Sequence, residues 1–114
     1  MDVINLKKEA AKIDSLYDYK TIAKMNGHIF TLVKAEVRTL DFHTHPDSDE
    51  VFFIVEGKMK LEFSDKLVEL KAGEMCVVPK GTNHRPVCDT AVTVMLIEVD
   101  GTLSPENTGG TYKA

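Results

Sequence analysis

The sequence has few of the features that mark several large protein classes. It contains no tryptophan and two cysteines, Cys76 and Cys88, which lack Cys-x-x-Cys spacing, and we expect both to be reduced thiols. No apolar run approaches the roughly 18 residues that span a bilayer. The charged triplet Lys7-Lys8-Glu9 comes too early to leave room for a signal-peptide core. These absences predict a cytoplasmic protein with no membrane partner.

Charge of one sign is not concentrated anywhere in the chain. The 14 lysines and arginines and the 18 aspartates and glutamates are mixed, with a formal net charge of −4. Without a basic block, neither a nucleic acid nor an anionic membrane is expected as a partner. Hydrophobic residues make up 43% and charged residues 28%, as in ordinary globular proteins. The 114 residues therefore predict one domain, residues 1–114, with one core.

Helical periodicity is found only at the N-terminus. Apolar residues recur there at steps of three and four, at Val3, Leu6, Ala10, Ile13 and Tyr17. This spacing predicts a short amphipathic helix within residues 1–17 that packs as a lid on a sheet edge.

Residues 19–99 show the alternation and turn spacing of an all-β barrel or sandwich. The strongest hairpin signal is Asn26-Gly27, because a type I′ turn needs positive φ at both central residues. We expect a turn at Glu56-Gly57-Lys58 and an irregular tail over 100–114. The predicted strands are 19–25, 28–37, 40–45, 51–55, 59–64, 67–70, 75–78, 84–88 and 91–99.

Two histidines stand two residues apart and are followed by a glutamate. Side chains two apart share one face of a β-strand, so His43 and His45 can aim two imidazoles at one point. Glu50 begins the next apolar run and can return a carboxylate to that point. Two neutral imidazoles and a carboxylate form an incomplete site for a divalent transition metal. Of the four histidines, His28 stands beside the predicted hairpin turn and is expected to be exposed.

Two segments of the chain resemble the two motifs of the cupin family. In the first, four residues separate His43-Thr44-His45 from Glu50, and six residues separate Glu50 from Gly57. In the second, five residues separate Gly73 from Pro79-Lys80-Gly81, two more precede His84, and Cys88 stands where asparagine is usual. Fifteen residues separate Gly57 from Gly73, which resembles the short form common in microbial cupins.

The resemblance implies a double-stranded β-helix, a jelly-roll barrel, with a metal in its mouth. The ligands it implies are His43, His45, Glu50 and His84. Three imidazoles and one carboxylate suit a divalent Fe, Mn, Ni, Zn, Co or Cu ion, and the donor types do not choose among these metals. Four protein ligands leave one or two positions open on a five- or six-coordinate ion, where a structural zinc site would be closed. Water or a substrate oxygen can bind there.

Strand alternation suggests which residues surround the metal. Phe52 and Ile54 share a face with Glu50 and are expected to line the barrel beneath the metal. Cys88 shares a face with His84 and is expected either near the metal or in the core.

Two cations flank His84 in the sequence. Lys80 and Arg85 either lie at the mouth and hold a phosphate or carboxylate, or they are solvated surface charges.

The chain also resembles small single-domain cupins that are labelled as similar to mannose-6-phosphate isomerase. The cues are Ile4-Asn5-Leu6, His84-Arg85-Pro86, Leu96-Ile97-Glu98 and Asn107-Thr108-Gly109. The first functional hypothesis is isomerisation of a small sugar or hydroxy-carbonyl compound, although no general base apart from the ligands is evident, and no catalytic residue is assigned. The alternatives are a metal-dependent dioxygenase and a non-enzymatic module that binds a small ligand or a metal.

One face of the strand after Glu50 is expected to meet a second copy of the chain. Phe53 and Val55 point away from the metal, and a small barrel has few ways to cover them. We therefore expect a homodimer with a two-fold interface.

Overall fold

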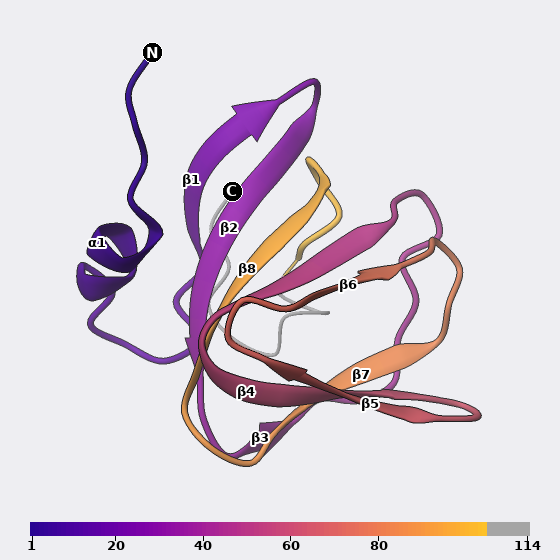
Figure 1. Ribbon diagram of the computed structural model, residues 1–114. Coiled ribbons are helices and arrows are strands. Elements are labelled where there is room, and N and C mark those ends of the chain that lie inside the picture. Colours follow the sequence, from indigo (N-terminus) through magenta and orange to yellow (C-terminus); the bar gives the residue numbers. More distant parts are fainter. Residues whose placement is uncertain (105–114) are drawn as a thin grey trace.

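The computed structural model describes residues 1–104, apart from the side chain of Arg38, as one short helix and eight strands (Figure 1). The elements are α1 (Leu6–Ala11), β1 (Lys20–Met25), β2 (His28–Ala35), β3 (Arg38–Thr39), β4 (Glu50–Phe63), β5 (Leu67–Lys71), β6 (Met75–Val78), β7 (His84–Cys88) and β8 (Val92–Val99). No helix in this part of the chain has the length and apolar character needed to cross a membrane.

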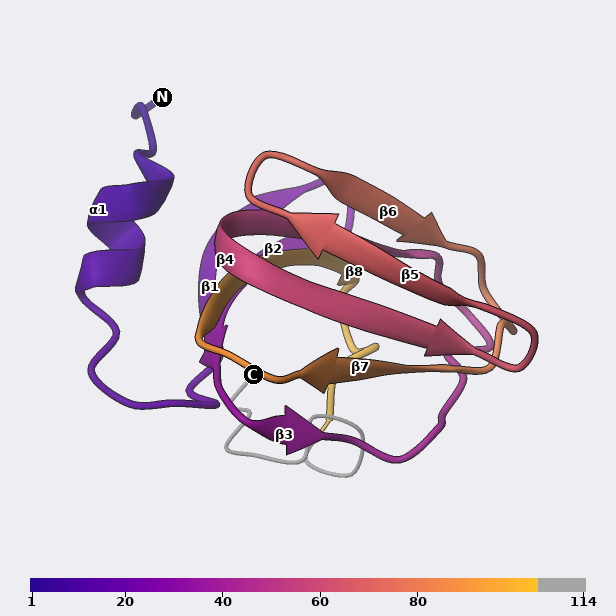
Figure 2. The same ribbon diagram turned by 60° about the horizontal axis from the view of Figure 1, so that its bottom comes forward.

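All strand pairs are antiparallel, and the long strand β4 joins two halves of a barrel. Its first half pairs with β8 and β6, and its second half pairs with β5 and β7. The path continues from β8 through β2 to β1, and from β7 to β3. Figure 2 shows the strands curling around an interior, with α1 outside the wall on the side of β1 and β2. The predicted all-β jelly-roll barrel with a short N-terminal helix is confirmed.

The predicted turn at residues 56–58 is wrong, because β4 runs through it without interruption. Gly57 adopts φ 80° at the point where β4 leaves the first half of the barrel for the second. The register with β8 shifts between Ile54 and Glu56, which marks an irregularity in the strand. A Cβ atom at Gly57 would collide with the carbonyl oxygen of Ala91. The glycine therefore lets one strand bend between two sheets, where sequence alone suggests a chain reversal.

The predicted strand over residues 40–45 is also wrong. Regular pairing in this region ends with the two residues of β3, Arg38–Thr39. Beyond them, only an isolated bridge between His43 and His84 is formed. The first two candidate ligands therefore lie on a connecting segment.

The N-terminal helix is shorter than its apolar periodicity suggests. It covers six residues, and the Asn5 side chain caps it by accepting a 2.9 Å hydrogen bond from the backbone N–H of Lys8. Ala10 and Ile13 pack with Leu32 of β2, and Val55 of β4 packs against this cluster. The helix therefore covers part of the barrel's outer face, including one of the two residues expected to face a partner subunit.

The Asn26-Gly27 hairpin is formed as predicted, with φ 50° and 77° at the two turn residues. The main core fills the barrel from the inward faces of β2, β4 and β8, and includes Phe52, Ile54 and Leu96. In the predicted irregular tail, residues 101–104 form no strand, yet Leu103 is buried in this core. Residues 105–114, which carry the Asn107-Thr108-Gly109 cue, lie outside the described part.

Candidate metal centre

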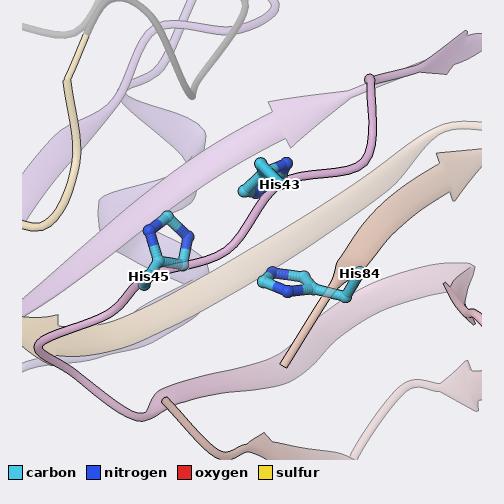
Figure 3. A group of neighbouring side chains, drawn as sticks. All are labelled: His43, His45 and His84. Atoms are coloured by element: carbon cyan, nitrogen blue, oxygen red, sulfur yellow. The ribbon is translucent and has the colours of Figure 1, made fainter. Parts of the chain in front are cut away.

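Three of the four histidines converge at one end of the barrel (Figure 3). His43 and His45 come from the segment between β3 and β4, and His84 is the first residue of β7. The ring of His43 lies 5.0 Å from that of His45 and 4.6 Å from that of His84, centroid to centroid. Each ring offers one nitrogen, and the three nitrogens lie within 4.8 Å of one another. One ion can therefore contact all three.

Backbone hydrogen bonds align the connecting segment with β7. The N–H of His43 donates to the carbonyl of His84 at 2.9 Å, and the N–H of His84 donates back to His43 at 3.0 Å. The N–H of Gly81 donates to the carbonyl of His45 at 3.0 Å. These three bonds hold both ends of the His-x-His segment against the second motif, without a continuous strand.

Backbone carbonyls also set the tautomers of two imidazoles. Nδ1 of His43 lies 2.8 Å from the carbonyl oxygen of Asp41, and Nδ1 of His84 lies 2.9 Å from that of Thr82. A carbonyl only accepts, so each Nδ1 carries the proton and donates it. Nε2 is thereby left as the metal-binding nitrogen, the usual arrangement for ligand histidines.

Glu50, the first residue of β4, completes the candidate ligand set. Its side chain is 3% exposed, and its Oε1 lies 3.2 Å from Nε2 of His84 and 3.4 Å from Nε2 of His45. Neighbouring ligand atoms about 2.1 Å from one ion are about 3.0–3.4 Å apart at angles of about 90–110°. The spacing of these atoms and their chemistry therefore fit a divalent transition metal.

The titration of the site shows how protons and a metal would compete for it. Burial favours a neutral Glu50, but hydrogen bonds from His45 and His84 outweigh it and lower the pKa of this carboxyl. Burial also disfavours a charged His84, but the hydrogen bonds to Glu50 and Thr82 and the charge of Glu50 together outweigh it and raise the pKa of this imidazole. Burial lowers the pKa of His43. In the metal-free site His84 therefore holds a proton more firmly than His43 does, and a metal must displace it.

A cavity of about 60 Å³ adjoins His43, His45 and Glu50. The predicted pocket residues Phe52 and Cys88 both line it. Apolar side chains form most of the remaining wall, and they come from the N-terminal segment, β2, β4, β8 and the start of the tail. A small molecule in this cavity would lie directly beside the histidine cluster.

The other predicted pocket residues lie elsewhere. Ile54 is fully buried in the core beyond the cavity wall. Arg85 follows His84 in β7 and so points to the other face, where its guanidinium donates to Glu62 at 2.8 Å and lies 4.4 Å from the centre of the Phe42 ring. Lys80 is exposed and does not line the cavity. Both cations therefore lie away from the cavity, as expected for surface charges.

Two features of this region were not anticipated from the sequence. Leu40 and Met59 line the cavity although neither belongs to a motif. Glu98 of β8 is fully buried, and neither of its carboxylate oxygens has a partner in the described part of the structure. The alternation of Val94, Leu96 and Glu98 was a signal for the inward position of this glutamate. Burial, together with the charge of Glu50, raises the pKa of Glu98 to about 9.

An antiparallel barrel with a histidine cluster built from these two motifs is the architecture of a cupin. The family model for the cupin domain matches residues 29–100, and the chain belongs to this family. Its relatives include YdbB, an uncharacterized protein of Bacillus subtilis (strain 168). The two are 37% identical over 82 residues, which cover 71% of this chain and 72% of that protein.

Solved structures show the same relationship. A cupin-2 domain containing protein from Shewanella frigidimarina NCIMB 400 is 38% identical with a TM-score of 0.81, over 85% of this chain and 94% of that one. Protein NMB1881 from Neisseria meningitidis is also 38% identical, with a TM-score of 0.77, over 87% of this chain and 100% of that one. These likenesses extend over most of each chain and establish the family and fold.

Proposed function

We propose that this cupin binds one divalent transition metal and uses it to bind and convert a small molecule. The proposed ligands are His43, His45, Glu50 and His84. The observation that carries the proposal is the convergence of three imidazole nitrogens, within 4.8 Å of one another, beside a cavity. A metal bound there would supply a Lewis acid or a redox centre with positions open to the cavity.

The protein's own groups prepare this site. The carbonyls of Asp41 and Thr82 orient two imidazoles, and Glu50 provides negative charge that favours a cation. The apolar wall limits access of water, which strengthens electrostatic interactions within the site.

The wall favours a dioxygenase over a sugar isomerase of the mannose-6-phosphate type. An isomerase needs a base that moves a proton beside the metal. The thiol of Cys88 is a poor base because burial and the charge of Asp89 raise its pKa to about 11. The hydroxyl of Tyr17 donates to the carbonyl of Glu36 at 2.8 Å and accepts from its N–H at 3.1 Å. Oxygenation of a metal-bound substrate needs no further base from the cavity wall.

The test begins with elemental analysis of the purified protein, and we expect about one transition metal per chain. The iron-loaded and zinc-loaded proteins are then incubated with a panel of small oxygen chelators, and both oxygen uptake and product are measured. Oxygen uptake with iron but not with redox-inactive zinc supports the dioxygenase. Turnover with both metals and no oxygen uptake supports the isomerase, and binding without turnover supports a non-enzymatic module. Metal-free protein that takes up neither ion would refute the proposal.

A further inference from the structure

Beyond the candidate ligands most of the cavity wall is apolar, although Tyr17 and Tyr19, which also line it, carry hydroxyls. Phe52, Met59 and Val94 line it and are 4%, 3% and 3% exposed. Among the described lining residues, Glu50 is the only carboxylate, and no lysine or arginine is present. A ligand beside the metal would therefore meet hydrocarbon and sulfur over most of its surface.

The cations nearest in sequence are held away from the cavity. The guanidinium of Arg85 is occupied by Glu62 and the Phe42 ring on the other face of β7. The backbone N–H of Lys80 donates to the Asp49 carboxylate at 2.8 Å, and Lys80 is exposed on the surface. A phosphate or a second carboxylate on a ligand would therefore have no cation partner in the described part of the wall.

Cys88 makes the wall less polar at one specific point. It stands where the second motif usually has asparagine, and it lines the cavity. A thiol of similar size replaces an amide that both donates and accepts strong hydrogen bonds. Its thiol remains neutral because burial raises its pKa. This position therefore offers a hydroxylated ligand much weaker hydrogen bonds than the usual asparagine would.

We infer that the cavity selects compact ligands with an apolar body and an oxygen pair for the metal, and that Cys88 is one determinant of this preference. The inference rests on the proposed metal site and names its ligand class. A hydroxyl or phosphate placed against the apolar part of the wall loses its hydration and gains no hydrogen bond there, so sugars and phosphorylated compounds are disfavoured. An apolar group of the same size gains by burial.

Three probes with one chelating head test the inference: 2-hydroxybutanoate, glycerate and 3-phosphoglycerate. The first two differ by a methyl in place of a hydroxyl, and the third adds a phosphate. Titration calorimetry on zinc-loaded protein should show 2-hydroxybutanoate binding about tenfold tighter than glycerate, and 3-phosphoglycerate binding weakest. Equal or tighter binding of either polar probe, or no binding of 2-hydroxybutanoate, would overturn the inference.

Cys88→Asn has a side chain of similar volume. It should reduce the ratio of the affinities for 2-hydroxybutanoate and glycerate to about threefold or less, whereas Cys88→Ala should keep this ratio. Because the ratio compares two ligands on the same protein, it is readable even if the variant melts at a lower temperature. An unchanged ratio in Cys88→Asn would refute the role of Cys88. Arg85→Ala should leave the weak binding of 3-phosphoglycerate unchanged, and a further loss would place a cation in the cavity, against the inference.

Zinc content is measured before each titration and separates the two possible failures. A chain that takes up no zinc refutes the proposed function. A chain that holds zinc but prefers glycerate or 3-phosphoglycerate refutes only the ligand class.

Discussion

Two buried glutamates on neighbouring strands of this barrel differ in almost every respect except burial. Glu50 of β4 is 2% exposed and lies between two imidazoles. Glu98 of β8 is 0% exposed, with no partner for either oxygen among the described residues. Thr31 of β2, also 0% exposed, lies in the same part of the barrel wall, and its hydroxyl has no hydrogen-bond partner within residues 1–104. It lies opposite Leu96, two residues from Glu98 along β8.

The difference shows that burial alone does not make a carboxylate into a metal ligand. Hydrogen bonds from two histidines lower the pKa of Glu50, so this side chain is ionised and available to a cation. Burial and the nearby negative charge of Glu50 raise the pKa of Glu98 to about 9, so that side chain is neutral near pH 7. The partners contributed by other segments decide the chemistry of each glutamate.

The largest effect is expected from removing a partner of Glu50. His84→Ala should lower metal affinity at least about a hundredfold, because it removes a ligand and leaves the buried carboxylate with one imidazole. Elemental analysis after dialysis should show near-zero occupancy in the variant. His28→Ala, at the hairpin and outside the cluster, is the control and should keep its metal. Undiminished occupancy in His84→Ala would show that the site is assigned incorrectly.

Loading the site with metal should stabilise the fold in a pH-dependent way. An ion present at about 100 times its dissociation constant adds about 2.7 kcal/mol to the free energy of unfolding. The raised pKa of His84 means that protons begin to compete above the ordinary imidazole range as pH falls. The melting-temperature difference between metal-loaded and chelated protein should be clear at pH 7 and should shrink near pH 4.5. A zero difference at pH 7, in protein shown to hold metal, would mean that the site and fold are not coupled.

Glu98→Gln tests whether the second buried glutamate is protonated in the folded protein. The pKa of Glu98 is raised from 4.5 to about 9, so between these values the folded state holds a proton that the unfolded state has lost. This contribution to stability is therefore present at low pH and is lost as pH rises. Relative to the wild type, the variant should gain about 1.4 kcal/mol for each pH unit between pH 6 and 8. Denaturant unfolding at both pH values measures the gain.

Thr31→Val is the matched control for Glu98→Gln. It removes the Thr31 hydroxyl, which also has no partner in the part of the chain that the structure describes, with little change in shape. It should stabilise the protein by about 1 kcal/mol, equally at pH 6 and 8, because no ionisation is involved. A gain in Glu98→Gln that is also independent of pH would contradict the protonation of Glu98.

The contrast between partnered and unpartnered groups extends to the outer face of β4. Helix α1 packs over Val55, but Phe53 lies opposite Met75 of β6, which is 55% exposed, and Val77 is 49% exposed. We propose that Phe53, Met75 and Val77 form the two-fold interface of a homodimer. Met75→Lys should weaken the dimer roughly tenfold, as measured by sedimentation. A wild-type monomer at high micromolar concentration would contradict the interface.

Local patterns were sufficient to predict much of the barrel. The turn signal before Met75 and the apolar run after it predicted β6 at its observed bounds, and the positive-φ requirement of Asn26-Gly27 predicted the hairpin. Gly57 was recognised as special, but its role was assigned incorrectly. A positive φ can reverse a chain or bend a strand, and which occurs depends on whether β8 and β5 are present to pair with both halves of β4.

The sequence by itself determined the candidate site, His43, His45, Glu50 and His84, through the resemblance of its two motif spacings to those of the cupin family. Only the tertiary structure decided how they meet, which is through a bridge between a connecting segment and β7. It also decided that Arg85 pairs with Glu62 and that Glu98 is buried with no partner among the described residues. The physical reason is the same in both cases. Whether a charged side chain is paired, solvated or neutralised depends on groups from distant segments, and the local sequence does not specify which of these groups lie nearby.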